Sequence, residues 1–168
     1  MFEKKARPKI HPPRKFLDQA FEAIAVFAMI AGIVLVIQAW GTLPQTIPTH
    51  FDAAGNADGF GSKGMIWLMP TIIVILVPSM LFLRRFPWLS NTPIKITDEN
   101  AEYQYGLISR MLSVLACVVA LLFLVLVTDT ISIAGGGTSL LGAWFMPAII
   151  VPIVGTLIWY FVSAIRGR

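Results

Sequence analysis

The chain has 168 residues, the usual size of one domain, but its composition excludes a protein whose whole surface faces water. Hydrophobic residues make up 57% of the chain, charged residues make up 13%, and the mean hydropathy is +0.76, as in integral membrane proteins. The net charge of +4 comes from basic residues that flank hydrophobic segments, which favours anionic lipid headgroups over nucleic acid as their partner.

The chain begins with a basic segment that precedes the first apolar run. Residues 1–15 contain three prolines and too few apolar groups to fold alone, so we expect this segment to be mobile. The first membrane span is expected at about residues 20–43, and its uncharged stretch of 21 residues, 23–43, matches the thickness of a bilayer. This stretch is longer than the apolar region of a signal peptide, so we interpret it as an uncleaved anchor.

Three further spans are expected at about residues 65–83, 107–130 and 140–165. The second contains Pro70 and Pro78, whose kinks neighbouring helices can accommodate. The third is expected to begin in water with Thr97 as its N-cap. The fourth has Trp144 and Trp159 near its two ends, as in an interfacial aromatic belt. Residues 1–168 are therefore predicted to form a single membrane domain.

The positions of lysine and arginine predict that both termini are cytoplasmic, because positive side chains are retained on that side during insertion. Lys63, between the first two spans, is the exception. The fold class that follows is an all-α membrane protein with four transmembrane helices. Twelve of the 13 basic residues lie before span one, between spans two and three, or after span four: Lys4, Lys5, Arg7, Lys9, Arg14, Lys15, Arg84, Arg85, Lys95, Arg110, Arg166 and Arg168.

The loop between the first two spans, residues 43–64, is predicted to form a small extracellular β-hairpin. Residues 47–51 can run extended, and residues 58–60 can return beside them. Between these arms, Gly55 and Asn56 can supply the positive φ angles of a tight turn.

This loop carries a spaced pattern that resembles a known family. The family is the domain of unknown function found in SdpI-like immunity proteins and in many small bacterial membrane proteins. The resemblance covers roughly residues 30–80 and implies a multi-pass protein of the bacterial cytoplasmic membrane. The matching residues are Leu43-Pro44, Ile47-Pro48-Thr49-His50-Phe51, Gly55-Asn56-Ala57-Asp58-Gly59 and Ser62-Lys63.

Five polar residues of the loop are the candidate ligand-binding or loop-structuring residues: His50, Asp52, Asn56, Asp58 and Lys63. In the binding interpretation they contact a ligand, and Lys63 pairs with Asp52 or Asp58. In the structural interpretation Asn56 and Asp58 bond turn amides, His50 ties the hairpin to the helix ends, and Lys63 extends toward lipid headgroups. A metal bound by His50, Asp52 and Asp58 is a weaker alternative, because a fourth ligand is missing.

The polar groups within the spans are expected to serve packing. Gln38 is interpreted as a residue that forms hydrogen bonds between helices. Ala28 and Gly32 are interpreted as a pair of small residues, four positions apart, that lets another helix approach closely. Cys117, the single cysteine, excludes an internal disulfide and lies in an apolar run. Asp129 is placed close to the outer interface. The middle of each span lacks ionisable groups, which disfavours a proton pump.

The cytoplasmic start of the third helix presents polar residues near one face. Glu99, Glu102, Tyr103 and Arg110 are interpreted as a solvated face, with docking of a protein partner as the alternative. No nucleophile elbow, phosphate loop or zinc-protease motif is found in the sequence, so we expect no enzyme and no cofactor.

The resemblance implies a non-enzymatic protein of the immunity or signalling type. Its outer loop would recognise a ligand at the membrane surface, such as a membrane-active peptide, while anionic lipids contact its cytoplasmic face. The alternatives are a small transporter, with a pathway between the proline-containing second and fourth spans, and an accessory subunit of a larger membrane complex.

Overall fold

The structure is a computed structural model that describes residues 7–167. Lys4, Lys5 and Arg168, used above for orientation, and the first part of the basic segment expected to be mobile lie outside these residues. The elements are α1 (Phe16–Ala39), β1 (Thr46–Phe51), β2 (Ala57–Ser62), the 3-10 helix η1 (Lys63–Trp67), α2 (Leu68–Leu83), the 3-10 helix η2 (Pro87–Leu89), α3 (Ala101–Ala134) and α4 (Phe145–Arg166).

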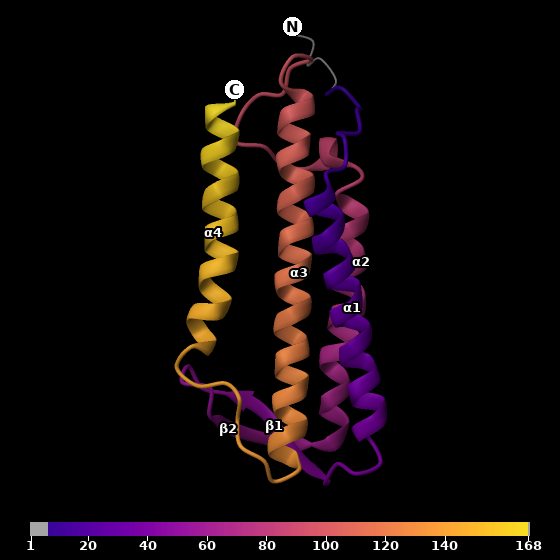
Figure 1. Ribbon diagram of the computed structural model, residues 1–168, viewed down its shortest axis with the longest axis vertical. Helices are drawn as coiled ribbons and strands as arrows, with labels where there is room; N and C mark the ends of the chain where they lie inside the picture. Colours follow the sequence, from indigo (N-terminus) through magenta and orange to yellow (C-terminus); the bar gives the residue numbers. More distant parts are fainter. Residues whose placement is uncertain (1–6, 168) are drawn as a thin grey trace, which may run out of the picture.

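The four long helices run side by side, and α3 lies in the middle (Figure 1). Helices α1 and α2 pack on α3 and on each other, while α4 packs on α3 from the opposite side (Figure 1). The start of the described chain and the end of α4 lie at one end of the bundle, and the hairpin lies at the other (Figure 1). We refer to these as the terminal end and the hairpin end.

Four segments of the described chain are long and apolar enough to cross a membrane, which confirms the predicted number of spans. Large apolar side chains cover their outer faces; Phe27, Ile75 and Val151 are each more than 60% exposed. Such faces suit a bilayer, where the helix satisfies its backbone groups internally and the side chains contact lipid. The protein is therefore a mainly helical, multi-pass membrane protein with one small hairpin.

The core between α1 and α3 consists of small side chains. Ala25 and Ala28 of α1 are buried with Ala116 and Ala120 of α3, which lets the two backbones approach closely. Gly32 is also buried, and a Cβ at this position would lie 4.0 Å from Leu124. The predicted pair of small residues in the first span, Ala28 and Gly32, thus packs within the bundle.

Two helices begin at residues other than the starts of the expected membrane spans. Helix α1 begins at Phe16, four residues before the start of the expected span, and Asp18 in its first turn accepts a hydrogen bond from Arg110 of α3. Helix α4 begins at Phe145, five residues after the start of the expected span, and the Leu140 N–H in the preceding loop donates to Asp129. These bonds involve tertiary neighbours, which periodicity does not report.

The start of α3 shows how Thr97 acts. The helix begins at Ala101 with Asn100 as its N-cap, so the predicted N-cap lies one turn too early. Thr97 and Asn100 nevertheless bond reciprocally, because the Thr97 N–H donates to Asn100 Oδ1 (2.9 Å) and the Asn100 N–H donates to Thr97 Oγ1 (3.4 Å). Thr97 therefore organises the turn that leads into the helix.

The predicted hairpin is present as the antiparallel pair β1 and β2, which lies across the end of α3 (Figure 1). Gly55 has φ of 81°, whereas no described residue other than glycine has positive φ, so Asn56 does not share this role. A two-stranded hairpin is marginal alone. This one is anchored by Ile47, which is 1% exposed and packs with Val36 of α1 and Val127 of α3.

Candidate functional site

Asp52 and Asn56 build the hairpin turn. Asp52 Oδ1 accepts the backbone N–H of Asn56 at 2.8 Å, and its Oδ2 accepts the Asn56 side-chain amide at 3.1 Å. The two residues also bond through their backbones, since the Asp52 N–H donates to the Asn56 carbonyl at 2.9 Å. The backbone N–H and then the side chain of Asn56 lower the pKa of Asp52. The turn is therefore built by Asp52 and Asn56, whereas the structural interpretation above assigned this role to Asn56 and Asp58.

His50 and Asp58 form a separate, solvent-facing pair. His50 Nδ1 lies 2.5 Å from Asp58 Oδ1, and the two side chains are 71% and 48% exposed. Gly59, opposite His50 on β2, makes room for the imidazole, because a Cβ there would lie 2.8 Å from the Cβ of His50. The hairpin thus holds a donor and a carboxylate together where an external group can reach both.

Lys63 does not pair with the hairpin carboxylates, which corrects the preferred expectation. Its Nζ lies 4.5 Å from the centre of the Trp40 ring at the end of α1, a cation–π contact. The reason is the hairpin register: Ser62 pairs with Thr46 at the base, whereas Asp52 lies beyond the last pair at the turn. Strand residues advance about 3.3 Å each, so the length of the hairpin separates them.

The weaker metal interpretation requires His50, Asp52 and Asp58 to converge on one point. Asp52 instead directs both carboxylate oxygens to Asn56. Among residues 7–167, no three His, Cys, Asp or Glu side chains gather as a metal-binding group. The hairpin therefore presents a two-residue polar pair and not a three-ligand centre.

Asp129 connects the hairpin to α3. The residue is fully buried near the end of that helix and accepts the Leu140 N–H at 2.6 Å. Ser139 Oγ lies 3.0 Å from an Asp129 oxygen and 3.1 Å from the Gly55 carbonyl of the hairpin turn. A hydroxyl between two acceptors joins the turn to the helix. The sequence placed Asp129 near this end, but no spacing indicates its contact with the turn.

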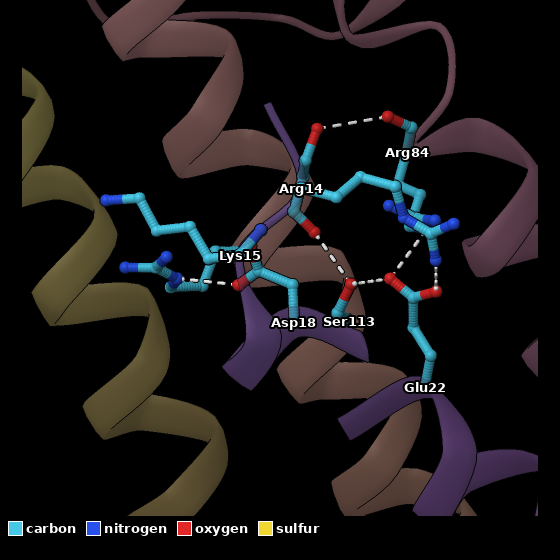
Figure 2. A network of polar contacts seen from close by, with 8 residues as sticks. Arg14, Lys15, Asp18, Glu22, Arg84 and Ser113 are labelled. Carbon is cyan, nitrogen blue, oxygen red and sulfur yellow. Dashed lines mark hydrogen bonds and ion pairs between the residues drawn. The ribbon is translucent and has the colours of Figure 1, made fainter. Parts of the chain in front are cut away.

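A second polar group lies at the terminal end, between α1, the end of α2 and α3. Asp18 accepts Arg110 Nε at 2.7 Å, and Glu22 contacts Arg14 at 2.6 Å and Arg84 at 3.0 Å. In Figure 2 the Glu22 carboxylate lies between Arg84 and Ser113, which donates to it at 3.1 Å. We call Arg14, Asp18, Glu22, Arg84, Arg110 and Ser113 the terminal-end network.

The terminal-end network is largely withdrawn from solvent. Asp18 is 6% exposed and Arg84 is 7% exposed. Burial lowers the pKa of Arg84, and the carboxylate of Glu22 acts in the opposite direction. A buried guanidinium is costly unless it is paired, and Glu22 supplies the carboxylate that pairs with Arg84.

The terminal-end network was not predicted from the sequence. Arg110 was placed on a polar face with Glu99 and Glu102, yet it pairs with Asp18 of α1. Another residue of the same helix, Gln104, is fully buried and donates to the Ala164 carbonyl of α4 at 3.0 Å. Two features of the sequence could have indicated the network. Asp18 and Glu22 are four residues apart on one helix face, and their basic partners lie at the ends of apolar spans.

The hairpin and parts of the two flanking helices match a known protein family model. Residues 26–74 match the model of a domain of unknown function, DUF1648. An uncharacterized protein of Archaeoglobus fulgidus is 31% identical over 78 residues, which cover 38% of this chain and 43% of that protein. The chain thus spans less than half the length of this relative. No solved structure matches.

The matched region runs from within α1 through the hairpin into α2. It contains His50, Asp52, Asn56, Asp58 and Lys63. The arginines of the terminal-end network lie outside it. The similarity therefore concerns the hairpin and its two flanking helices.

Proposed function

We propose that this protein is a non-enzymatic membrane protein of the immunity or signalling type, whose hairpin binds a ligand at the outer membrane surface. The observation that carries the proposal is the exposed pair of His50 and Asp58 on a hairpin whose turn is built separately by Asp52 and Asn56. A binding group that is not needed to hold the turn is free to engage a ligand. The motif resemblance to SdpI-like immunity proteins supports the same role.

A membrane-active peptide is the ligand class that this pair fits. Such peptides carry both apolar and cationic groups at the bilayer surface. Asp58 offers a carboxylate to a cationic side chain, and Phe60, two positions further along β2 and 61% exposed, offers apolar contact. The imidazole of His50 supplies a second polar contact.

Contacts of the hairpin with α3 could transmit a ligand-induced movement of the turn to the helix bundle. Gly55 lies in its turn, and the Ser139 hydroxyl connects Gly55 to Asp129 of α3. A ligand that shifts the turn would therefore displace the end of the helix that contacts all three others. We propose that the protein lies in the bacterial cytoplasmic membrane with the hairpin outside and both termini in the cytoplasm.

The test is the susceptibility of cells to a panel of membrane-active peptides, with the gene deleted and restored. We expect deletion to increase killing by at least one peptide, and the double variant His50→Ala, Asp58→Ala not to restore protection. Loss of charge-assisted hydrogen bonds of this kind lowers peptide affinity roughly ten- to a hundredfold.

Gln45→Ala is the matched control, because Gln45 is exposed at the base of the same hairpin and its side chain belongs to neither pair. This variant should protect as the wild type does. Equal protection by the double variant and the wild type, at equal amounts in the membrane, would contradict the proposal.

A small transporter is the second candidate, and an open groove beside Arg110 favours it. This groove has a volume of about 360 Å³, is open to the outside and lies between α3 and α4, with Arg110, Pro152 and Trp159 among its lining residues. The expected pathway between the second and fourth spans is not formed, since α3 stands between α2 and α4 (Figure 1). Uptake of a substrate into vesicles that contain only this protein would favour transport over peptide recognition.

A further inference from the structure

A cavity of about 220 Å³ opens beside the terminal-end network. It lies between the segment before α1, the end of α2 and the first turns of α3. Its charged lining consists of Arg14, Arg84 and Arg85 with a single carboxylate, Asp18, and His11 completes the rim. Its volume is below that of most drug-sized sites, so it suits a compact group.

The cavity has an excess of positive charge. Asp18 is already engaged, since Arg110 Nε and the Lys15 N–H donate to its two oxygens at 2.7 and 3.2 Å. Within residues 7–167, no carboxylate forms an ion pair with Arg85, which is exposed at the cavity wall. The lining therefore carries guanidinium charge that the described part of the protein does not neutralise.

One buried donor points to the same conclusion. Arg84 is 7% exposed, and its Nε lies 3.0 Å from Glu22 Oε1. The two atoms are not aligned for a hydrogen bond, so this buried Nε has no hydrogen-bond partner among the described residues. Buried donors are nearly always hydrogen-bonded, so Glu22 compensates this guanidinium only in part, and its positive charge adds to that of the cavity.

The position of the cavity decides between a lipid and a soluble anion. The apolar segment of α2 ends at Leu83, directly before the arginines. Phe82 and Leu83 are 58% and 46% exposed, so apolar surface continues from the cavity toward the middle of the bilayer. A ligand with an anionic head and acyl chains matches both parts, whereas a free anion matches only the first.

We propose that this cavity binds the phosphate of an anionic phospholipid. Arg14 and Arg85 donate to the phosphate oxygens, and the buried Arg84 guanidinium attracts the phosphate by its charge without donating to it. Guanidinium groups suit phosphate because their planar N–H donors bind two oxygens at once. Basic pockets at the ends of transmembrane helices bind anionic headgroups in this manner. The acyl chains lie against Phe82 and Leu83.

The experiment is native mass spectrometry of the full-length protein with phosphatidylglycerol and phosphatidylcholine of identical acyl chains. The wild type should retain one phosphatidylglycerol in preference to phosphatidylcholine. Arg85→Gln should weaken phosphatidylglycerol binding about fivefold, and the double variant Arg14→Gln, Arg85→Gln further, because each surface cation contributes on that scale. Arg84 is left unchanged because it is buried in the fold.

Lys95→Gln is the matched control, since it removes one positive charge from the exposed surface between α2 and α3 without touching the cavity lining. Its lipid binding should equal that of the wild type. An equal loss in Lys95→Gln and Arg85→Gln, or no loss in either, would overturn the proposal, because attraction would then depend on net charge alone. Thermal unfolding in detergent verifies that every variant is folded.

A competition arm separates lipid from free anion. Inorganic phosphate is added to the protein and phosphatidylglycerol, with chloride at equal ionic strength as the reference. The lipid should stay bound, because its acyl chains add apolar contacts. Displacement of the lipid by phosphate but not by chloride would assign the cavity to a soluble anion and overturn the lipid assignment.

Discussion

Asp52 and Asp58 lie on the same hairpin, but their carboxylates face different surroundings. Asp52 turns inward to the amides of the turn, whereas Asp58 turns to His50 and to solvent. A similar division exists at the other end, where Glu22 holds a buried arginine on one side and an exposed one on the other. The loss of unfolding free energy on removing one of these charges therefore depends on whether its partner is left buried and unpaired or remains in contact with water.

The lowered pKa of Asp52 makes the turn sensitive to acid. A carboxylate whose pKa is lowered by folding stabilises the folded state at pH values above its pKa in the unfolded chain, which is near 4. This stabilisation is lost as the pH falls through the pKa of the folded state. Protection of the Asn56 amide from hydrogen exchange, measured by NMR, should be constant above about pH 5 and decline below about pH 4. Asp52→Asn should lack this decline, whereas Asp58→Asn should keep it. Constant protection in the wild type at acid pH would contradict the assignment.

Removal of the Glu22 charge should destabilise the bundle strongly. Glu22→Gln leaves the buried Arg84 without its counter-ion, which costs about 3–5 kcal/mol of unfolding free energy. Arg14→Gln removes the other ion pair of Glu22, whose arginine is 54% exposed, and should cost less than about 1 kcal/mol. Unfolding in mixed detergent and dodecyl sulfate micelles measures both. Equal costs would show that Arg84 finds another partner.

At the level of elements, the hairpin is held by packing and by one loop. Ile47 anchors β1 in the core, and the loop before α4 closes over the turn. At Gly55 an added Cβ would lie 2.3 Å from the Gly142 nitrogen and 2.6 Å from the Leu141 Cβ. The turn and the loop are thus in direct backbone contact.

Two glycines with nearly the same backbone angle allow this contact to be measured. Gly55 and Gly136 have φ of 81° and 84°, but nothing lies within 4 Å of a Cβ built at Gly136. Gly136→Ala should cost only the strain of the left-handed backbone, about 1–2 kcal/mol. Gly55→Ala should cost more, because the loop must also move. Chemical unfolding compares the two, and equal losses would argue against close packing of the loop on the turn.

For the whole molecule, α3 is the central member. It packs on α1, α2 and α4, Asp129 connects it to the hairpin, and Arg110 and Gln104 connect it to α1 and α4 at the terminal end. Polar contacts thus lie at the two ends of the bundle, with a small-residue apolar core between them. Polar groups near the bilayer surfaces cost less than groups at its centre, which is the arrangement expected of a stable membrane bundle.

The proposed orientation is tested by labelling intact cells with a membrane-impermeant maleimide. Asn56→Cys, in the hairpin turn, should react, and Lys95→Cys, between α2 and α3, should not. The native Cys117 is buried in the span of α3 and provides the unlabelled baseline. Reaction at residue 95 without reaction at residue 56 would place the hairpin in the cytoplasm and contradict the proposed function.

Local features of the sequence determined the four spans and the hairpin. Apolar runs of bilayer length specify spans in any context, and Gly55 supplies the positive φ of the turn directly. The spaced motif of the loop likewise singled out His50 and Asp58, together with Asp52, Asn56 and Lys63. It did not reveal that Asp52 and Asn56 bond each other while Asp58 pairs with His50.

Only the tertiary structure decided which distant polar groups meet. Asp18 and Arg110 are joined across 92 positions of sequence, and Lys63 contacts Trp40 instead of a carboxylate. Such pairs depend on how each helix is rotated and shifted against its neighbours, which is set by close packing of small side chains such as Ala25 and Ala116. Hydrophobic length determines that a helix crosses the bilayer, but not which side of it faces another helix.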